Sequence, residues 1–209
     1  MLYCLVACNL VSQVRGVCKK DTLTPAEQLV VDEHNKLRRE HKNTLDLCYA
    51  ESGDDATFTS QAWAEELATF GEFKYSKGEH GENIAKKSTS DNLSPDILTS
   101  YNTSIHKWYG EIKDWSFTKN AAVSSSKVVR HFTQVVWRDT SQVNCGHATS
   151  ASQTGSGITY YVVCQYYVAG NKGNVEEFGK QVAVLINGVS PNVSASLMIV
   201  VSILAYVLL

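Results

Sequence analysis

The fold of this chain is decided by eight residues that read Arg130-His131-Phe132-Thr133-Gln134-Val135-Val136-Trp137. They place a titratable ring, a hydroxyl, an amide and an indole among apolar side chains. Phe132 and Val136 are four residues apart, as are His131 and Val135, so each pair shares one face of a helical turn. Thr133 and Gln134 are expected to bond backbone groups. The stretch therefore predicts a buried turn of helix that carries a histidine.

The composition of the chain limits what it can bind. Its 209 residues include 19 basic and 21 acidic side chains, which gives a formal charge of −2. This length favours one domain with processing segments at its ends. The near balance of charge provides no field that would attract nucleic acid or acidic lipid. The composition therefore argues against nucleic-acid binding.

Residues 1–16 have the pattern of a secretory signal peptide. An apolar run, Leu2–Val11, is followed by polar residues and then by Val14 and Gly16, which suit the two key positions before a cleavage site. Cleavage before Val17 would deliver the mature chain to the extracellular space.

The mature chain keeps four of the six cysteines, namely Cys18, Cys48, Cys145 and Cys164. Four cysteines permit three pairings, and four buried thiols are the alternative. The oxidising environment outside the cell favours disulfides. Cys145 and Cys164 flank an expected hairpin, so we predict that they pair across it and that Cys18 pairs with Cys48.

The C-terminal end resembles a lipid-anchor signal. Leu197–Leu209 is apolar or nearly so, but as a helix it would reach only about 20 Å against a hydrocarbon core of roughly 30 Å. The small residues Asn187 and Gly188 and a mostly polar spacer precede it, an order that matches a glycosylphosphatidylinositol (GPI) attachment signal. We expect residues 181–196 to be a linker with the attachment site and residues 197–209 to be removed. A short tail anchor and a final core strand are the alternatives.

Helical spacing of apolar residues predicts three helices, over about 24–41, 60–73 and 94–112. The first begins with a capping box at Thr24, and the third begins at Ser94 with Pro95 in its first helical position. The second is expected to bury Trp63, Leu67 and Phe70 on one face. The apolar residues of the third are Leu98, Tyr101, Ile105, Trp108 and Ile112.

Two β runs, Val143–Thr149 and Ile158–Tyr167, are separated by a loop rich in Gly and Ser and predict a hairpin. The polar stretch Lys113–Lys127 is expected to be irregular. Asn92 and Asn102 begin glycosylation sequons, and Asn102 falls on the third predicted helix.

Five motifs occur in one order: H-N-x-x-R from His34, G-E-N from Gly81, W-Y-x-E from Trp108, H-F-T-Q-V-V-W from His131 and C-Q-Y-x-x-x-G-N from Cys164. Together they resemble the CAP superfamily of cysteine-rich secretory proteins, venom allergens and plant pathogenesis-related proteins. The resemblance covers about residues 27–174 of an expected domain at 17–180. It implies an α+β fold, a three-layer α–β–α sandwich. One departure is Val168, which stands where the family signature has proline.

The resemblance also implies a central cleft, in which two histidines and two glutamates converge and in some members hold a divalent metal. Glu82, Glu111 and His131 match that set, but Tyr75 occupies the place of the first histidine. A phenol is a poorer ligand than imidazole at neutral pH. We therefore expect no required cofactor, and zinc bound weakly or not at all by Glu82, Glu111 and His131.

Other histidines and Arg38 are expected to have structural roles or to lie outside the cleft. His34 and Arg38, one helical turn apart, are expected to tie the first helix to neighbouring loops. His80 is expected to be solvated in a loop, and His106 and His147 are expected to lie away from the cleft.

The function implied by the resemblance is that of an extracellular, non-enzymatic protein. It would bind a sterol or fatty-acid-like lipid at apolar surfaces between helices, or recognise a receptor as an immune-modulating or adhesive protein. The alternative is a hydrolase, either metal-dependent or with Ser76 activated by His131 and a glutamate. The sequence contains neither G-x-S-x-G nor H-E-x-x-H. Contact with a membrane would come through the lipid anchor, and assembly into a homodimer is left open.

Overall fold

The computed structural model describes residues 18–51, 58–90, 96–151 and 157–187. The predicted signal peptide, Asn92, Ser94, Gly188 and the apolar tail lie outside the described residues. The elements in chain order are α1 (Pro25–Arg38), β1 (Cys48–Tyr49), α2 (Ser60–Phe70), β2 (Gly81–Ser88), α3 (Ile97–Tyr109), η1 (Gly110–Asp114), β3 (Trp115–Ser116), β4 (Ala121–Ala122), α4 (Arg130–Val135), β5 (Gln142–Ala151), β6 (Ile158–Tyr167) and α5 (Val175–Gln181).

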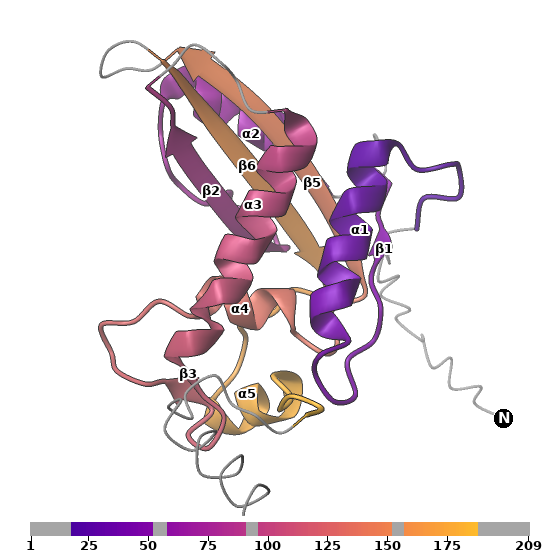
Figure 1. Cartoon of the computed structure of the whole chain (residues 1–209), viewed down its shortest axis with the longest axis vertical. Coiled ribbons are helices and arrows are strands. Elements are labelled where there is room, and N and C mark those ends of the chain that lie inside the picture. Colours follow the sequence, from indigo (N-terminus) through magenta and orange to yellow (C-terminus); the bar gives the residue numbers. More distant parts are fainter. Residues whose placement is uncertain (1–17, 52–57, 91–95, 152–156, 188–209) are drawn as a thin grey trace, which may run out of the picture.

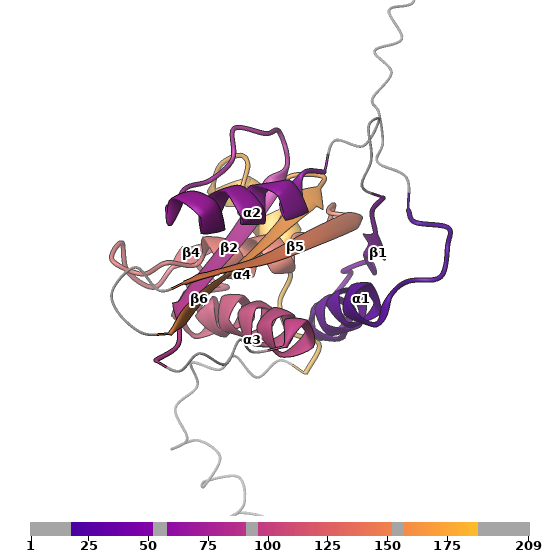
Figure 2. The ribbon, with the colours of Figure 1, turned by 90° about the horizontal axis from the view of Figure 1, so that it is seen from above.

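The elements form three layers. Strands β1, β5, β6 and β2 make one sheet in that order. Helix α2 covers one face of the sheet, and α1 and α3 lie side by side on the other (Figure 2). The β3–β4 hairpin, α4 and α5 gather at one end of the sheet (Figure 1). The predicted α+β sandwich is confirmed.

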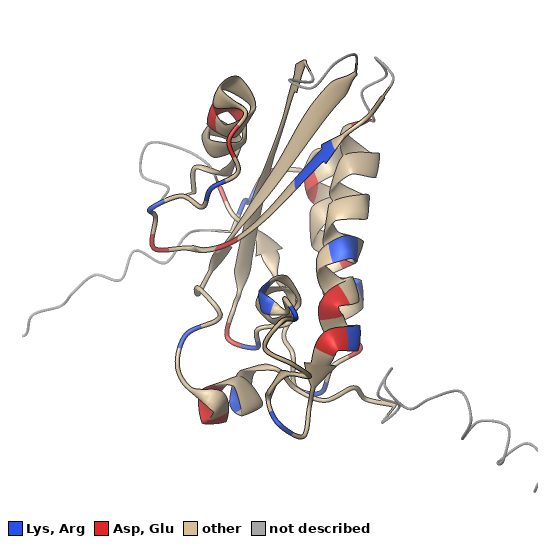
Figure 3. Ribbon diagram, turned by 90° about the vertical axis from the view of Figure 1, so that its left-hand side faces the viewer, with Lys and Arg blue, Asp and Glu red and all other residues tan. Residues whose placement is uncertain are grey.

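Charged residues do not gather by sign. Figure 3 shows acidic and basic positions interleaved along the helices and loops, with most of the sheet free of charge. Among the described residues, no helix has the length and apolar character needed to cross a membrane.

Helix α1 begins as predicted and ends early. The Thr24 hydroxyl accepts from the Glu27 N–H at 3.3 Å, and the Glu27 carboxylate accepts from the Thr24 N–H at 2.8 Å. The predicted end near His41 is wrong, because the chain leaves the helix at Arg38. His41 instead forms an antiparallel bridge with Leu185, close to the C-terminal end of the described chain.

The predicted bounds of α2 also need correction. The helix ends at Phe70 because Gly71 takes a left-handed conformation, with φ 67°, that glycine adopts without a steric penalty. Phe70 was expected to be buried with Trp63 and Leu67, yet it is 64% exposed. The buried face of α2 is instead centred on Ala64 and Leu67, which pack in a cluster under the sheet.

Helix α3 begins at Ile97 rather than at Ser94, because Asp96 is its cap and accepts from the Thr99 N–H at 2.9 Å. Leu98, expected on the apolar face, is 36% exposed. Ile112 lies beyond the α-helix in the 3-10 turn η1. The stretch 113–127, expected to be irregular, contains the short hairpin β3–β4.

The sheet carries the predicted hairpin and both predicted disulfides. Strands β5 and β6 pair antiparallel, with Cys145 directly opposite Cys164. These two residues are bonded, and Cys18 is bonded to Cys48, which ties the start of the described chain to β1. The G-E-N-I-A run forms the edge strand β2, paired with β6.

Residues 130–137 form α4 and the turn after it. Phe132, Val135 and Val136 are fully buried in the main core. The Gln134 side chain accepts from the Gly170 N–H at 2.8 Å. A Cβ atom at Gly170 would lie only 2.8 Å from that amide oxygen and 2.9 Å from Trp137 Cγ, so this close approach of two loops requires glycine.

Arg38 ties α1 to the loop after α4. Its guanidinium is fully buried and donates to the carbonyls of Leu45, Val135, Trp137 and Thr140 at 2.8–3.0 Å. Burial lowers the pKa of Arg38 to about 10, so the group stays charged at neutral pH. The cation satisfies carbonyl groups that no strand or helix pairs.

Arg38→Ala should lower the free energy of unfolding by about 3 kcal/mol, because the buried carbonyls of Val135 and Thr140 would lose the donor that the structure gives them. Arg39→Ala is the matched control, since Arg39 is exposed and pairs only with Asp46. Urea unfolding followed by circular dichroism measures both. Equal small losses in the two variants would contradict the anchoring role of Arg38.

Candidate functional site

His131 and Glu111 form the centre of the cleft. His131 lies at the start of α4, and Glu111 lies in η1 directly after α3. His131 Nδ1 is 2.7 Å from Glu111 Oε1. The other carboxylate oxygen, Oε2, accepts from the N–H groups of His131 and Phe132 at 3.1 and 3.2 Å. Both oxygens of Glu111 are therefore engaged, and the imidazole is held in one orientation.

Tyr75 closes the other side of the ring. Its hydroxyl lies 3.1 Å from His131 Nε2. Because Nδ1 faces the Glu111 carboxylate, it carries the ring proton, and Nε2 accepts from the phenol. Burial raises the pKa of Tyr75, and the nearby Glu82 and Glu111 carboxylates add to this effect. The phenol is thus a proton donor at neutral pH, and it occupies the nitrogen that would otherwise bind a ligand.

Glu82 is held on β2 by its neighbours. Oε1 accepts from the Ser76 N–H at 2.8 Å, and Oε2 accepts from the Gln165 side chain at 3.0 Å. Gln165 lies directly opposite Glu82 in the β2–β6 register. Both oxygens of the second carboxylate in the cleft therefore accept a hydrogen bond, which fixes its position.

A second hydrogen-bond network, formed by Asn83, Tyr166 and His34, connects the backbone of His131 to helix α1. Asn83 donates to the His131 carbonyl at 3.1 Å and to the Tyr166 hydroxyl at 3.3 Å. The Tyr166 hydroxyl lies 2.9 Å from His34 Nε2, and His34 Nδ1 lies 2.7 Å from the Val30 carbonyl. Burial lowers the pKa of His34 to about 4, so the ring is neutral and its Nε2 accepts from Tyr166. The predicted structural role of His34 fits these contacts.

The residues of the cleft do not fit a metal ion in this arrangement. Zinc needs free lone pairs from several ligands at about 2 Å. Here Tyr75 bonds His131 Nε2, the one imidazole nitrogen that could face a metal, and each oxygen of Glu82 and Glu111 already accepts at least one N–H group. Within the ranges that the structure describes, no group of three or more His, Cys, Asp or Glu is placed to hold a metal. Weak zinc binding stays a prediction.

The other candidate residues are placed as follows. Ser76 contributes its backbone N–H to Glu82, whereas the imidazole Nε2 is bonded to Tyr75. The hydrolase alternative needs a hydrogen bond between the Ser76 hydroxyl and His131, and the described residues show no such bond. His106 pairs with Glu33 of α1 at 2.9 Å, away from the cleft as predicted.

His80 lies in a loop as predicted, but it is partly buried rather than fully solvated. Its ring lies 4.3 Å from the Phe58 ring and 6.5 Å from the Tyr167 ring, centre to centre. Burial lowers its pKa. Phe58 thus covers one side of the His80 imidazole, although the polar residues around His80 in the sequence predict an exposed ring. His147 lies on β5, beside the Tyr101 and Tyr160 rings, and so away from the cleft.

The sequence did not single out Asn83, Gln165 and Tyr166 as parts of the site. Their signal was present, because they lie inside the G-E-N and C-Q-Y motifs. Their partners on β2, α1 and α4 become neighbours only through strand pairing and helix packing. Asn102 is exposed on α3, and Asn187 is exposed at the end of the described chain.

Comparison with known proteins gives the family. The model of the family described as "CAP: Cysteine-rich secretory protein family" matches residues 31–166, more than half of the chain. The chain belongs to the CAP family.

Two relatives illustrate the match. Protein PRY2 of Saccharomyces cerevisiae is 34% identical over 144 residues, covering 68% of this chain and 37% of the relative. Cysteine-rich secretory protein 1 of Mus musculus is 34% identical over 155 residues, covering 72% of this chain and 58% of the relative. The chain thus spans well under two thirds of the length of these relatives.

The solved structures agree on the fold. The structure of BmVAL-1 superposes with a TM-score of 0.56 at 23% identity and covers 75% of this chain and 83% of that one. At this identity the likeness establishes the CAP fold and leaves function to the residues themselves.

Tyr75→His should raise zinc affinity, because it supplies a second imidazole beside His131, Glu82 and Glu111. Tyr75→Phe is the control, since it frees His131 Nε2 without adding a ligand. Calorimetric titration with zinc should show at least about tenfold tighter binding for the histidine variant. Tight stoichiometric zinc binding by the unmodified protein would contradict the prediction that Glu82, Glu111 and His131 bind zinc weakly or not at all.

Proposed function

We propose that this is a non-enzymatic, extracellular CAP protein that binds a sterol or a fatty-acid-like lipid. The observation that carries the proposal is the hydrogen bonding inside the cleft. His131 bonds Glu111 and Tyr75, and Glu82 accepts from the Ser76 N–H and the Gln165 side chain. A substrate that used these atoms would have to displace hydrogen bonds already made. The cleft is therefore better suited to hold the fold together than to turn over a substrate.

The lipid region that we propose is the interface of α1 and α3 over β5. The two helices lie side by side (Figure 1). Partly buried apolar residues on α1, among them Ala26 and Leu29, pack against the main core. Ile97 and Leu98 at the start of α3 are 41% and 36% exposed. An apolar ligand between the two helix starts would cover this surface.

Polar atoms in the same region suit a ligand with one polar group. Ser100 Oγ of α3 and His147 Nε2 of β5 are buried without a hydrogen-bond partner among the described residues. The His147 ring lies 6.3 Å from the ring of Tyr101, which also belongs to α3. A buried polar atom without a partner is costly. A sterol hydroxyl or a fatty-acid carboxyl would offset this cost.

A bulky side chain placed in the α1–α3 interface should abolish lipid binding, whereas removal of the His131 side chain from the cleft should not. Ala26→Phe should reduce the retained lipid at least tenfold, measured by native mass spectrometry of protein made through a secretory pathway. Gln28→Phe, with the same added bulk on the exposed side of α1, is the matched control. His131→Ala should leave lipid retention unchanged.

Three outcomes would contradict the proposal. One is wild-type protein that retains no lipid, and a second is equal loss of lipid in the two phenylalanine variants. The third is peptide hydrolysis that His131→Ala abolishes, which would favour the hydrolase alternative. Saturable binding of a protein receptor without any retained lipid would favour the receptor alternative.

We further propose that a GPI anchor holds the protein at the cell surface, with attachment at Asn187 or Gly188. The chain just before these residues is tied to the domain. The Lys42 N–H donates to the Val184 carbonyl at 2.9 Å, and the Ile186 N–H donates to the Glu40 carbonyl at 2.8 Å. An anchor attached immediately after Ile186 would therefore hold the end of the domain that carries α5 toward the membrane.

Treatment of expressing cells with a phosphatidylinositol-specific phospholipase should release the protein into the medium. The physical reason is that the anchor would be the sole membrane attachment once residues 197–209 are removed. Western blotting of medium and cell pellet measures the release, with a transmembrane protein as control. Retention on the cells, with the tail peptide still present by mass spectrometry, would contradict the anchor.

A further inference from the structure

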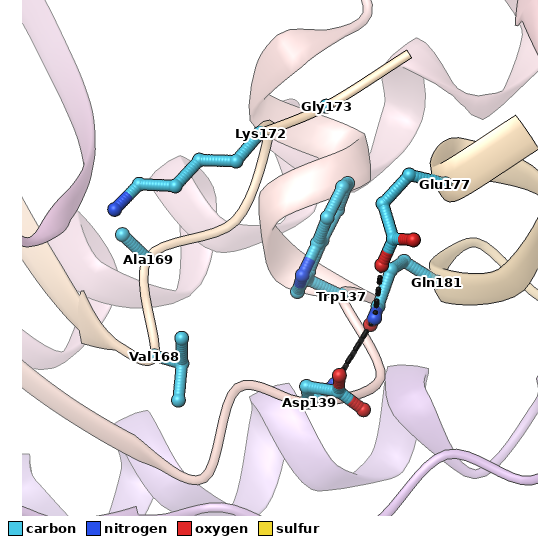
Figure 4. A pocket seen from close by; sticks show the side chains of 8 residues that line it. All are labelled: Trp137, Asp139, Val168, Ala169, Lys172, Gly173, Glu177 and Gln181. Atoms are coloured by element: carbon cyan, nitrogen blue, oxygen red, sulfur yellow. Dashed lines mark hydrogen bonds between the residues drawn. The ribbon is translucent and has the colours of Figure 1, made fainter. Parts of the chain in front are cut away.

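A pocket of about 310 Å³ lies between the loop after β6, the turn after α4 and helix α5 (Figure 4). This volume is at the small end of the range for ligand pockets, about 300–1,000 Å³, and suits a small organic ion. The proposed lipid interface and the cleft share none of its lining residues. These are Trp137, Asp139, Val168, Ala169, Lys172, Gly173, Glu177 and Gln181.

One wall of the pocket carries two carboxylates held by one amide. The buried Gln181 side chain donates from Nε2 to Asp139 at 2.7 Å and to Glu177 at 2.8 Å (Figure 4). Its oxygen accepts from the Asp139 N–H at 3.1 Å. The hydrogen bond from Gln181 is the main reason that the pKa of Asp139 is lowered. The amide thus fixes two negative charges beside the pocket.

The other side of the pocket offers two donors without partners. Lys172 is exposed and forms no ion pair in the described part of the chain. Trp137 is only 3% exposed, and its indole N–H has no hydrogen-bond partner among the residues that the structure describes. Figure 4 shows the indole between Lys172 on one side and Glu177 on the other. The indole nitrogen is not among the buried side-chain atoms that lack a partner, so this N–H is accessible and free to donate to an acceptor on a ligand.

From this arrangement we infer a binding site for a zwitterion that carries a methylated ammonium and an anionic oxygen group a few bonds apart, as phosphocholine does. The anionic group would accept from the Lys172 ammonium and the Trp137 N–H. The cationic group would face the Asp139 and Glu177 carboxylates. A ligand with only one sign of charge would meet a like charge on one of the two walls.

The methylated form of the cation follows from the apolar surfaces beside the carboxylates. Asp139 already pairs with Arg138, and Glu177 lies 4.0 Å from Lys180. Both carboxylates also accept from Gln181, so the cation would gain as much from contact with these surfaces as from new hydrogen bonds. A quaternary ammonium donates no hydrogen bond and interacts through charge and contact with apolar and aromatic surfaces. Trp137, Val168 and Ala169 supply those surfaces.

Isothermal titration calorimetry of the full mature chain with phosphocholine tests the inference. Phosphocholine should bind at least tenfold more tightly than choline or inorganic phosphate alone. Lys172→Gln and Glu177→Gln should each weaken phosphocholine binding about tenfold. The glutamine at 177 keeps an acceptor for Gln181 and removes only the charge. Lys107→Gln, an exposed lysine on α3, is the matched control and should change nothing.

Two results would overturn the inference. The first is no heat of binding with millimolar phosphocholine in a protein whose thermal unfolding is normal. The second is equal affinity for phosphocholine and for either half alone, with no effect of Lys172→Gln or Glu177→Gln. Competition by phosphatidylcholine vesicles would support a lipid headgroup as the source of the zwitterion. Competition by dissolved phosphocholine alone would support the site with a soluble ligand. Neither arm depends on the α1–α3 lipid interface, so the two proposals fail separately.

Discussion

The carboxylate of Glu111 is the group on which the centre of the molecule depends. A helix exposes N–H groups in its first turn, and α4 begins without a side-chain cap of its own. Glu111 fills that role from another element, because one of its oxygens accepts two N–H groups at the start of α4 and the other receives the His131 ring. Charge-assisted bonds of this kind are about twice as strong as neutral ones. One side chain thereby joins α3 to α4.

This arrangement explains why residues of catalytic type serve stability here. The His131 carbonyl continues the network to Asn83, and Asn83 continues it to Tyr166 and the neutral ring of His34. Buried polar networks in which every member has a partner rigidify a fold, whereas partial ones are costly. Any ligand that entered the cleft would have to replace bonds already made. The function proposed above accordingly uses surfaces outside the cleft.

Two such surfaces are separated in space. The α1–α3 interface lies over the sheet and offers apolar area with two polar atoms that lack partners. The pocket beside α5 offers two carboxylates fixed by Gln181, and a lysine lines it as well. The first arrangement suits a ligand that is mostly apolar, and the second suits a small ion. Under the two proposals, one domain would carry two chemically different sites.

The sequence by itself indicated the family, the three long helices and the main hairpin, and it predicted both disulfide pairings that the structure confirms. These features depend on local signals: the capping box at Thr24, the alternation of β runs, and motifs whose spacing is read along the chain. That Tyr75, Glu82, Glu111 and His131 share one cleft was implied by the resemblance of those motifs to the CAP family. The sequence also indicated that Tyr75 replaces an imidazole.

Only the tertiary structure decided how those residues are used. That Tyr75 bonds His131 Nε2, that Gln165 holds Glu82, and that Phe58 covers His80 all depend on contacts between residues far apart in sequence. Burial of α2 through Ala64 rather than Phe70, and the end of α1 at Arg38, depend on which neighbours each helix meets. The pocket of Trp137, Lys172 and Gln181 had no sequence motif, because three separate segments form it. Local patterns record the preferences of single segments, whereas hydrogen-bond partners are set by packing between them.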